Sequence, residues 1–308
     1  MRRMRRHRRA CTVAALFALV GSHDGARRRL AAPDPFASLC RAPCTFHEFS
    51  PATTNISKDD IAAYQSTGVQ EIVNAFIRRR NVLKGRTVLE NGCDITGRTG
   101  VFFQQMSEAN YVGVNCGFNS KFPSTLVASN ARTRFLATNC TVLPFRDGVI
   151  DKVFSDNVVE HVRNLKQYIG ETYRVLKPGG AALFKFYPTW DTPRGHHVHD
   201  GMVASWAKAS CGTRATTNYK NDGTFIPDGA HLSWPREKLA AQLRAKLAST
   251  CRDEMVTQIV RYIYDGHGIN KRPRQEIVRL LTEDLPWAKV VDNSAGKGHR
   301  IYLRKEAG

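Results

Sequence analysis

The stretch from Val142 to Pro188 most constrains the fold, because it predicts two buried strands joined by a helix. A β-branched and aromatic run typical of a buried strand comes first: Val149, Ile150, Val153 and Phe154. Apolar residues at helical spacing follow: Val158, Val159, Val162, Leu165, Ile169, Tyr173 and Leu176. Asp156 and Asn157 offer N-cap oxygens, Pro178-Gly179-Gly180 ends the helix, and residues 181–186 form a second apolar run. This order predicts a parallel strand–helix–strand unit with a right-handed crossover.

The preceding segment predicts more units of the same kind. Residues 86–90, 111–115 and 133–138 are strand candidates, and a helix carries Val101, Phe102, Phe103 and Met106. Strands that alternate with helices indicate a doubly wound parallel sheet. Ligands of such sheets lie beyond the carboxyl ends of the strands. The candidate site residues are therefore those that follow each strand: 90–97, Asn115, Cys116, Asn139, Cys140 and Asp156.

Three linked motifs resemble one family. These are Leu143-Pro144-Phe145 with its following acids, the Glu160-His161 pair, and the run YRVLKPGG at 173–180. At this spacing they resemble class I S-adenosylmethionine-dependent methyltransferases of the methyltransferase-11 type, over residues 81–188 and, less fully, over the last twenty residues. The resemblance implies an α/β fold, a Rossmann-like doubly wound parallel sheet with a terminal antiparallel strand. It also implies S-adenosyl-L-methionine as cofactor and methyl transfer to an unidentified acceptor.

The resemblance places the cofactor on a defined set of residues: Glu90, Gly92, Cys93, Asp94, Gly97, Asn115, Cys116, Asn139, Cys140 and Asp156. The chain departs from the family at three of them, because Asp94 replaces a glycine and Asn115 and Asn139 replace carboxylates. Losing two charge-assisted hydrogen bonds weakens binding by roughly 1–3 kcal/mol. One alternative is therefore a catalytically inactive methyltransferase-fold protein acting as a binding or regulatory domain. Another is an enzyme of this fold with a different ligand.

The predicted organisation has three parts. Residues 1–32 form a targeting segment or basic arm, 33–58 a linker, and 59–308 the methyltransferase-like domain, with a helical substrate or lid insertion at 189–286. A helix at 59–80 leads into the first strand and either covers the cofactor or only packs on the sheet. Helices are expected at 235–247, 253–264 and 274–282, followed by terminal strands at 287–292 and 299–304.

The N-terminus is typical of a targeting segment. Nine arginines and one acid fall in the first thirty residues, and residues 11–20 form an apolar stretch of signal-peptide length. A membrane-bounded compartment is expected, the secretory pathway slightly ahead of an organelle, or the cytoplasm if the segment is not functional. The glycosylation pattern at Asn55 favours secretion, whereas a second at Asn139 argues against it. The net charge of +19 favours anionic partners or membrane association through the N-terminus, without a specific nucleic-acid motif. The oligomeric state stays open.

Histidines follow the second strand of the Val142–Pro188 unit, near the expected point of methyl transfer. His196 and His197 are the predicted catalytic residues, because imidazole takes protons near neutral pH. Two alternatives stay open: His196, His197 and His199 bond loop backbone, or they bind a divalent metal with Asp200. A polar and aromatic loop at 221–231, which ends in His231, is expected to face the same crevice.

Cysteines follow three of the predicted strands. Cys93, Cys116 and Cys140 are interpreted as small lining residues, with a disulfide or a metal site as alternatives. Cys40 and Cys44 either pair with each other or stay reduced.

Overall fold

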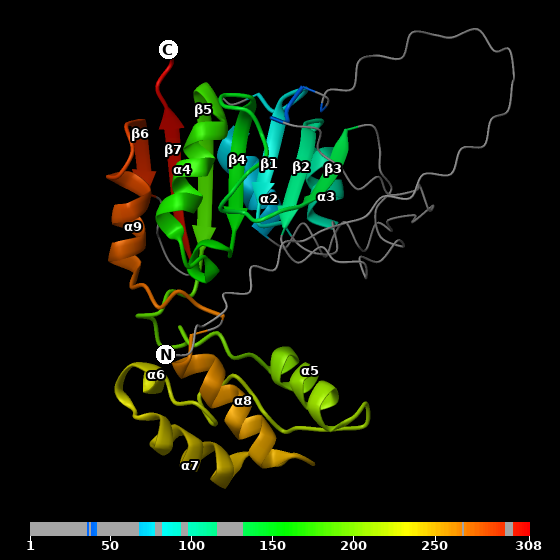
Figure 1. Cartoon of the computed structure of the whole chain (residues 1–308), viewed down its shortest axis with the longest axis vertical. Helices are drawn as coiled ribbons and strands as arrows, with labels where there is room; N and C mark the ends of the chain where they lie inside the picture. Colours follow the sequence, from blue (N-terminus) through cyan, green and yellow to red (C-terminus); the bar gives the residue numbers. More distant parts are fainter. Residues whose placement is uncertain are drawn as a thin grey trace, which may run out of the picture. The chain divides into compact units, whose positions relative to one another are not determined.

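The structure is a computed structural model that describes residues 36, 38–41, 68–77, 82–93, 98–115, 132–266, 268–292 and 298–308. One compact unit spans Asp34–Gly308. Figure 1 shows a sheet flanked by helices, with further helices grouped beyond one end of the strands.

Seven strands form a single mixed sheet. They are β1 (Thr87–Asn91), β2 (Asn110–Asn115), β3 (Thr133–Ala137), β4 (Ile150–Asp156), β5 (Leu176–Phe186), β6 (Trp287–Asp292) and β7 (His299–Lys305). The strand order is β3-β2-β1-β4-β5-β7-β6, and the pairs from β3 to β5 are all parallel. β7 runs antiparallel to both β5 and β6. The predicted Rossmann-like sheet with a terminal antiparallel strand is confirmed.

Helices cover both faces of the sheet. α4 (Leu165–Val175) and α9 (Arg274–Thr282) lie on one face, and α2 (Gly68–Ile77) and α3 (Arg98–Ser107) on the other (Figure 1). Tyr168 and Leu281 are buried in the first layer, and Phe76 and Phe103 in the second. Because both faces are covered, β1 is buried along its whole length and β4 along all but its last residue, including the charged Asp151 and Lys152. The carboxyl ends of β1 to β5 are thereby fixed at one edge.

The prediction for the helix between β4 and β5 is wrong at both ends. Asn157 has a left-handed φ of 53°, and a short 3-10 turn, η1 (Val159–His161), follows it. α4 begins only at Leu165, where the side chain of Asn164 caps the Gln167 N–H. It ends at Val175 instead of at the Pro-Gly-Gly turn, since Leu176 already pairs with Ile150 in the sheet. Residues 158–162 therefore lie outside α4, at the edge of the sheet where β4 ends.

The insertion between β5 and β6 has a hydrophobic core of its own. Its helices are α5 (Asp200–Cys211), α6 (Ala230–Ser233), α7 (Arg236–Lys246) and α8 (Arg252–Tyr264). Side chains of α5, α7 and α8 pack together, and a disulfide joins Cys211 to Cys251. The helices predicted at 235–247, 253–264 and 274–282 are confirmed within a residue. α5 was not predicted, because only Val203 and Ala207 give it a buried apolar repeat.

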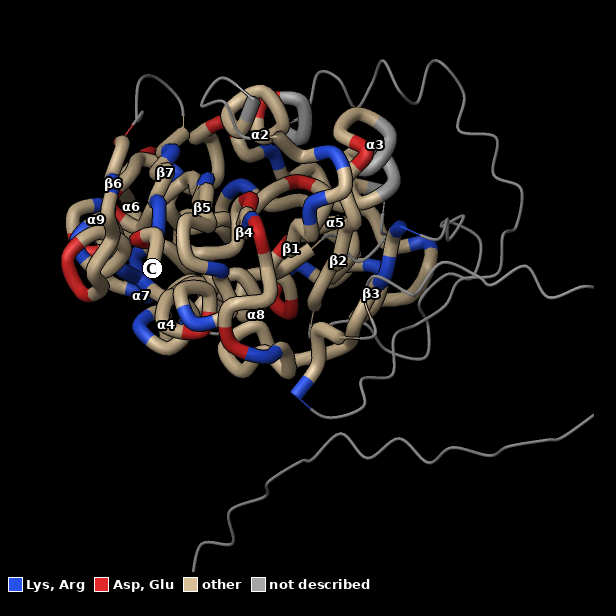
Figure 2. Tube along the Cα trace, turned by 90° about the horizontal axis from the view of Figure 1, so that it is seen from above, with Lys and Arg blue, Asp and Glu red and all other residues tan. Residues whose placement is uncertain are grey.

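Several predictions fall outside the described residues. They are the targeting segment, the helix over 59–67, and the site residues Asp94, Gly97 and Cys116. None of the helices in the described ranges combines the length and the apolar character needed to cross a bilayer. Figure 2 shows basic and acidic residues interspersed over the described elements.

Candidate functional site

Gly92 forms the turn that ends β1. Its φ of 94° is one that side chains with a Cβ rarely adopt, and an added Cβ would lie 2.5 Å from Cγ1 of Val158. The N–H groups of Gly92 and Cys93 both donate to the Val114 carbonyl of β2, at 3.0 and 2.8 Å. This turn therefore brings the ends of β1 and β2 and the residues that follow β4 into contact.

Glu90 and Asn91 point to opposite faces of the sheet from the end of β1. The Glu90 carboxylate accepts a hydrogen bond from the Tyr111 hydroxyl within the core. The amide of Asn91 donates to the Cys140 carbonyl and the Thr172 hydroxyl, whereas its buried Oδ1 has no hydrogen-bond partner among the described residues. Asn91 was not among the predicted site residues, although its unsatisfied oxygen lies at the expected cofactor edge.

Asn115 ends β2 and is tied to the Gly92 turn. Its Nδ2 donates to the carbonyl of Cys93, so the side chain links the ends of β1 and β2. The amide therefore has a structural reason to replace the carboxylate that the resemblance implies, since a carboxylate cannot donate.

Asn115→Asp is expected to destabilise the ligand-free protein by about 1–2 kcal/mol. The substitution removes this donor and places a carboxylate oxygen against the Cys93 carbonyl. Urea unfolding of the two proteins measures the difference. Asn110→Asp is the matched control. It removes an exposed hydrogen bond from the Asn110 amide to the Gly85 carbonyl at the opposite end of β2, and should lower the free energy of unfolding by less. Equal stability of wild type and Asn115→Asp would contradict this role.

Asn139 lies in a tight turn after β3. Its Oδ1 accepts from both the backbone N–H and the hydroxyl of Thr141, each at 2.9 Å. This oxygen of the predicted cofactor-binding set is therefore already engaged within the turn. Cys93 packs on the α3 face of the sheet, and Cys140 on the α4 face. The two thiols therefore do not pair with each other.

Asp156 ends β4 within a row of charges on the α2 face. Its carboxylate lies 3.1 Å from Nζ of Lys185, its register neighbour on β5. Arg300 on β7 continues the row and pairs at 2.7 Å with Glu71 of α2. Burial raises the pKa of Asp156, and Lys185 acts in the opposite direction. The row offers both signs of charge at the edge where the resemblance places the cofactor.

Glu160 is a buried carboxyl at the same edge. Its Oε1 accepts from the Tyr187 N–H at 3.2 Å, and Oε2 has no hydrogen-bond partner among the described residues. Burial raises the pKa of Glu160 to about 8, and nearby Asp156 contributes to the rise. Glu160 is therefore largely neutral at pH 7 and offers an O–H group. It belongs to the motif quoted for the resemblance, but was not predicted as a site residue.

His161 and His197 meet at the end of β4. Their rings pack edge to face with centroids 4.8 Å apart. Nδ1 of His161 donates to the carbonyl of Gly268, so Nε2 is the nitrogen that accepts in the neutral imidazole. Nε2 of His197 donates to the Pro188 carbonyl, which leaves Nδ1 unprotonated. Burial lowers the pKa of His197 to about 4, so its imidazole is neutral at pH 7. Two nitrogens able to accept protons thus lie beside Glu160.

His196 points away from this edge into the insertion. It is fully buried, its Nδ1 accepts from the Val198 N–H at 3.0 Å, and its ring packs against that of His231. His199 caps α5 by accepting from the Met202 N–H. His196, His197 and His199 therefore each bond to a backbone group. Among the described residues, no His, Cys, Asp and Glu side chains are grouped as a metal site requires.

The loop at 221–231 contacts the histidine loop as expected. Nε2 of His231 donates to the Trp190 carbonyl at 2.8 Å, and Asp228 pairs with Arg194 at 3.3 Å. These contacts hold the two loops against each other.

The free energy of unfolding is expected to fall on acidification, partly through His196. Burial lowers its pKa from 6.5 to about 3, with the nearby His231 and His197 adding to the effect. Below pH 6.5 the unfolded chain therefore binds a proton that the folded chain excludes. Stability is full above pH 6.5 and falls by about 1.4 kcal/mol per pH unit towards pH 3 for this group.

Urea unfolding between pH 4 and 7 measures this slope. For each protein the slope is taken relative to its own free energy of unfolding at pH 7. The slope should be smaller in His196→Gln than in the wild type, since glutamine does not titrate. An unaltered slope in His196→Gln would show that His196 is not excluded from protonation.

Comparisons with known proteins agree with the motifs. The family model for a methyltransferase domain matches residues 89–184. Phosphoethanolamine N-methyltransferase 1 of Zea mays is 25% identical over 151 residues, which cover 44% of this chain and 30% of that protein. An uncharacterized methyltransferase of Mycobacterium marinum is 32% identical over 165 residues, 51% of this chain and 63% of that protein. The chain thus spans less than two thirds of the length of these relatives.

One solved structure has a weak similarity to this chain. The 1,6-didemethyltoxoflavin-N1-methyltransferase of Burkholderia thailandensis, crystallised with S-adenosylhomocysteine, is 12% identical with a TM-score of 0.42, over 80% of this chain and 82% of that one. The family model and the strand order agree with the motifs. The chain resembles class I S-adenosylmethionine-dependent methyltransferases of the methyltransferase-11 type, whose domain model matches residues 89–184.

Proposed function

We propose that this chain binds S-adenosylmethionine at the carboxyl edge of β1, β2 and β4 and transfers its methyl group to an acceptor held under the insertion. One observation carries the proposal: the methyltransferase-like run folds so that the Gly92 turn, Asn115 and Asp156 end neighbouring strands. The oxygens of Asn91 and Glu160 that lack partners among the described residues lie at these same strand ends. Asn91 Oδ1 can accept a hydrogen bond from a bound ligand, and the protonated carboxyl of Glu160 can donate one.

The residues have separate roles in this proposal. Glu90, Gly92, Cys93, Asp94, Gly97, Asn115, Cys116, Asn139, Cys140 and Asp156 are the cofactor-binding set. The sulfonium of the cofactor supplies an activated methyl group, so the protein mainly aligns the acceptor and removes its proton. His161 and His197 are the candidates for proton removal, because each has one ring nitrogen that accepts in the neutral imidazole. His196 supports the loop through the Val198 N–H.

The proposal is tested by release of S-adenosylhomocysteine from S-adenosylmethionine, with a panel of alcohol, amine and thiol acceptors. His161→Ala or His197→Ala should lower turnover by roughly a hundredfold, with cofactor affinity little changed. His199→Ala, which removes only a helix cap, is the matched control and should retain turnover. Unchanged turnover in both variants would remove this pair from the mechanism.

The compartment forms part of the proposal. The Cys211–Cys251 disulfide, together with a disulfide at Cys40, supports an oxidising environment such as the secretory pathway. This agrees with the targeting segment expected at residues 1–32. A fluorescent fusion of residues 1–32 that stays diffuse in the cytosol would contradict it.

A further inference from the structure

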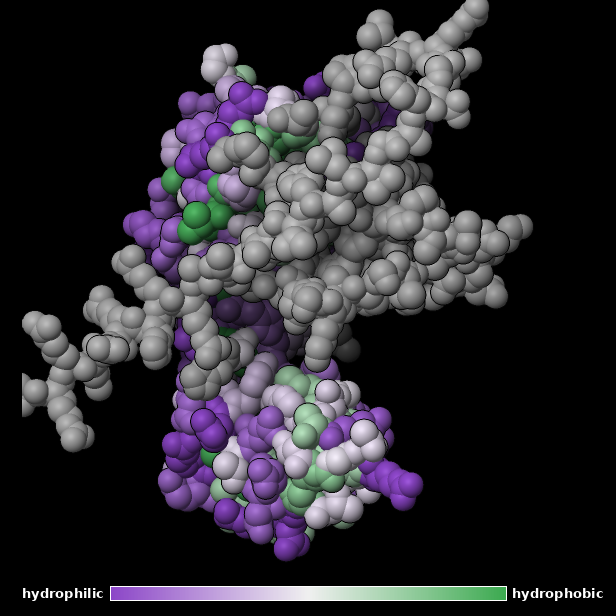
Figure 3. All heavy atoms as spheres, turned by 45° about the vertical axis from the view of Figure 1, so that its right-hand side comes forward, coloured by the Kyte–Doolittle hydropathy of each residue, from purple (hydrophilic) through white to green (hydrophobic). Residues whose placement is uncertain are grey.

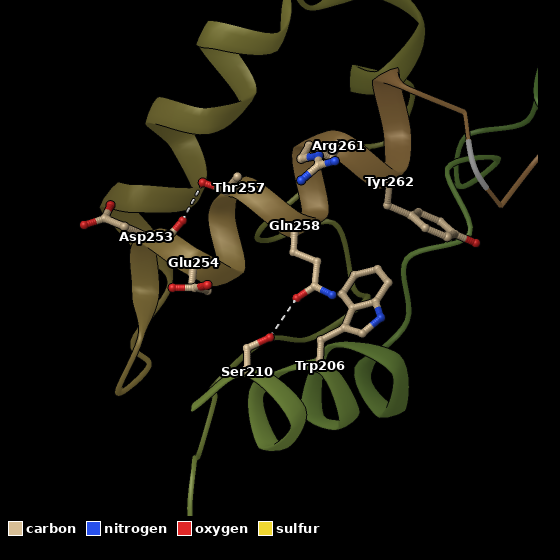
Figure 4. Close-up of a pocket in the computed structure, with 8 residues that line it drawn as sticks. All are labelled: Trp206, Ser210, Asp253, Glu254, Thr257, Gln258, Arg261 and Tyr262. Atoms are coloured by element: carbon tan, nitrogen blue, oxygen red, sulfur yellow. Dashed lines mark hydrogen bonds between the residues drawn. The ribbon is translucent and has the colours of Figure 1, made fainter. Parts of the chain in front are cut away.

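A groove between α5 and α8 belongs to the insertion, and the methyl-transfer proposal does not use it. It has a volume of about 710 Å³. Figure 4 shows Trp206 and Ser210 of α5 and Gln258 of α8 pointing towards one another. It lies on the outer side of α8, opposite the buried Met255, Ile259 and Ile263. Figure 3 shows apolar and polar residues side by side over this part of the surface.

Two aromatic rings form one wall of the groove. The rings of Trp206 and Tyr262 have centroids 5.3 Å apart and are inclined by 58°. Both side chains are only half-buried, so part of each ring faces the groove. Burial raises the pKa of Tyr262, which keeps its hydroxyl protonated at all physiological pH values. The wall therefore presents apolar faces together with indole N–H and phenol O–H groups.

The remaining lining is polar and carries both signs of charge. The Ser210 hydroxyl donates to Oε1 of Gln258 at 3.4 Å. The carboxylate of Glu254 has no ion-pair partner among the described residues, whereas Asp253 is paired with Arg244 at 3.2 Å. Arg261 adds a guanidinium, 3.8 Å from Asp265. Mixed charge disfavours a strongly cationic or anionic ligand and suits a neutral one that both donates and accepts hydrogen bonds.

Gly268 contacts both the groove wall and His161, one of the proposed bases. An added Cβ at Gly268 would lie 2.2 Å from the Tyr262 ring, so this ring packs directly on the Gly268 backbone. The carbonyl of Gly268 accepts the hydrogen bond that orients His161. The same connecting segment is held to the edge of the sheet by Asn270, whose N–H donates to the Glu160 carbonyl at 2.9 Å. The Tyr262 wall of the groove therefore packs on the backbone segment that orients His161.

We infer that this groove is a saccharide subsite, which holds a neutral sugar portion of the methyl acceptor against Trp206 and Tyr262. A pyranose ring offers an apolar C–H face to an aromatic ring, and its hydroxyls match the acids, amide and hydroxyls of the opposite wall. The inference rests on the proposed function in one respect: the sugar is part of the methyl acceptor only if the chain transfers a methyl group. Sugar binding itself is independent of the cofactor.

The test is ligand-detected saturation-transfer NMR on the full chain without cofactor. The probes are maltotriose, cellotriose, mannotriose and chitotriose. At least one should bind, with the signal carried by ring C–H protons. Trp206→Ala and Glu254→Gln should each weaken that binding at least tenfold. Glu237→Gln, which changes an exposed first-turn acid of α7 away from the groove, is the matched control and should leave it unchanged.

The outcomes separate the two proposals. Sugar binding without binding of S-adenosylhomocysteine would support the groove and remove the methyl-transfer proposal. Failure of all four saccharides would overturn the subsite, as would binding that persists in both Trp206→Ala and Glu254→Gln. A further outcome is that a trilysine peptide is the only probe that binds, with its binding lost in Glu254→Gln. That result would overturn the saccharide subsite and indicate a cationic partner.

Discussion

Gly92→Val is expected to abolish binding of S-adenosylhomocysteine, with a loss of more than about a hundredfold. The new side chain would meet Val158, since even a Cβ lies 2.5 Å from its Cγ1, and the φ of 94° is unfavourable for valine. Val158 leads into the turn that holds Glu160. The substitution therefore displaces the ends of β1 and β4 together. Calorimetric titration measures the affinity.

A control variant separates strain from displacement. Gly85 also has a positive φ, 69°, and precedes the same strand, but an added Cβ there meets nothing within 4 Å. Gly85→Ala should therefore lower stability only modestly and keep the affinity for S-adenosylhomocysteine. The affinity of Gly92→Ala for S-adenosylhomocysteine should lie between those of Gly92→Val and Gly85→Ala. Wild-type affinity in Gly92→Val would place the cofactor elsewhere.

Loss of the Cys211–Cys251 disulfide is expected to destabilise the insertion by about 4 kcal/mol. The bond spans a separation of 40 residues, and closing a loop of this size removes entropy mainly from the unfolded chain. It joins the end of α5 to the start of α8, so its loss also loosens the groove between them. Hydrogen exchange of the Cys211→Ser/Cys251→Ser variant measures the effect. Protection should fall in α5, α7 and α8, and fall less in β1 and β4.

The disulfide prediction has an internal control. Reducing agent should lower protection of the insertion in the wild type, but should not lower it further in the double variant. An insertion that is equally protected in both proteins would show that its hydrophobic core suffices without the bond.

The sheet could be predicted from the sequence because most of its strands carry β-branched and aromatic residues. Ile150, Val153 and Phe154 in β4 are one such set, and residues 181–186 in β5 form a second apolar run. The start of α4 could not be predicted. Val158, Val159 and Val162 continue its apolar repeat, yet the left-handed Asn157 and the cap at Asn164 divide the segment. Local backbone geometry therefore overrode the apolar period.

The candidate site was predicted only in outline. Strand ends follow from the parallel topology, so Gly92, Asn115 and Asp156 were expected to lie at one edge and do so. Their partners depend on contacts distant in sequence, such as Asn115 with Cys93 or His161 with Gly268. His196 and His197 are adjacent in sequence but face different surroundings, which no spacing rule reveals. The groove between α5 and α8 follows no motif, because two helix faces form it.

The central claim is that this edge binds S-adenosylmethionine, and titration of the full chain with S-adenosylhomocysteine in a calorimeter tests it most directly. We predict one site per chain, weaker than is usual for the fold by about tenfold to a hundredfold, because Asn115 and Asn139 replace carboxylates. Binding should be lost in Gly92→Val and retained in Gly85→Ala. Absence of binding at millimolar ligand in the folded wild-type protein would contradict the account.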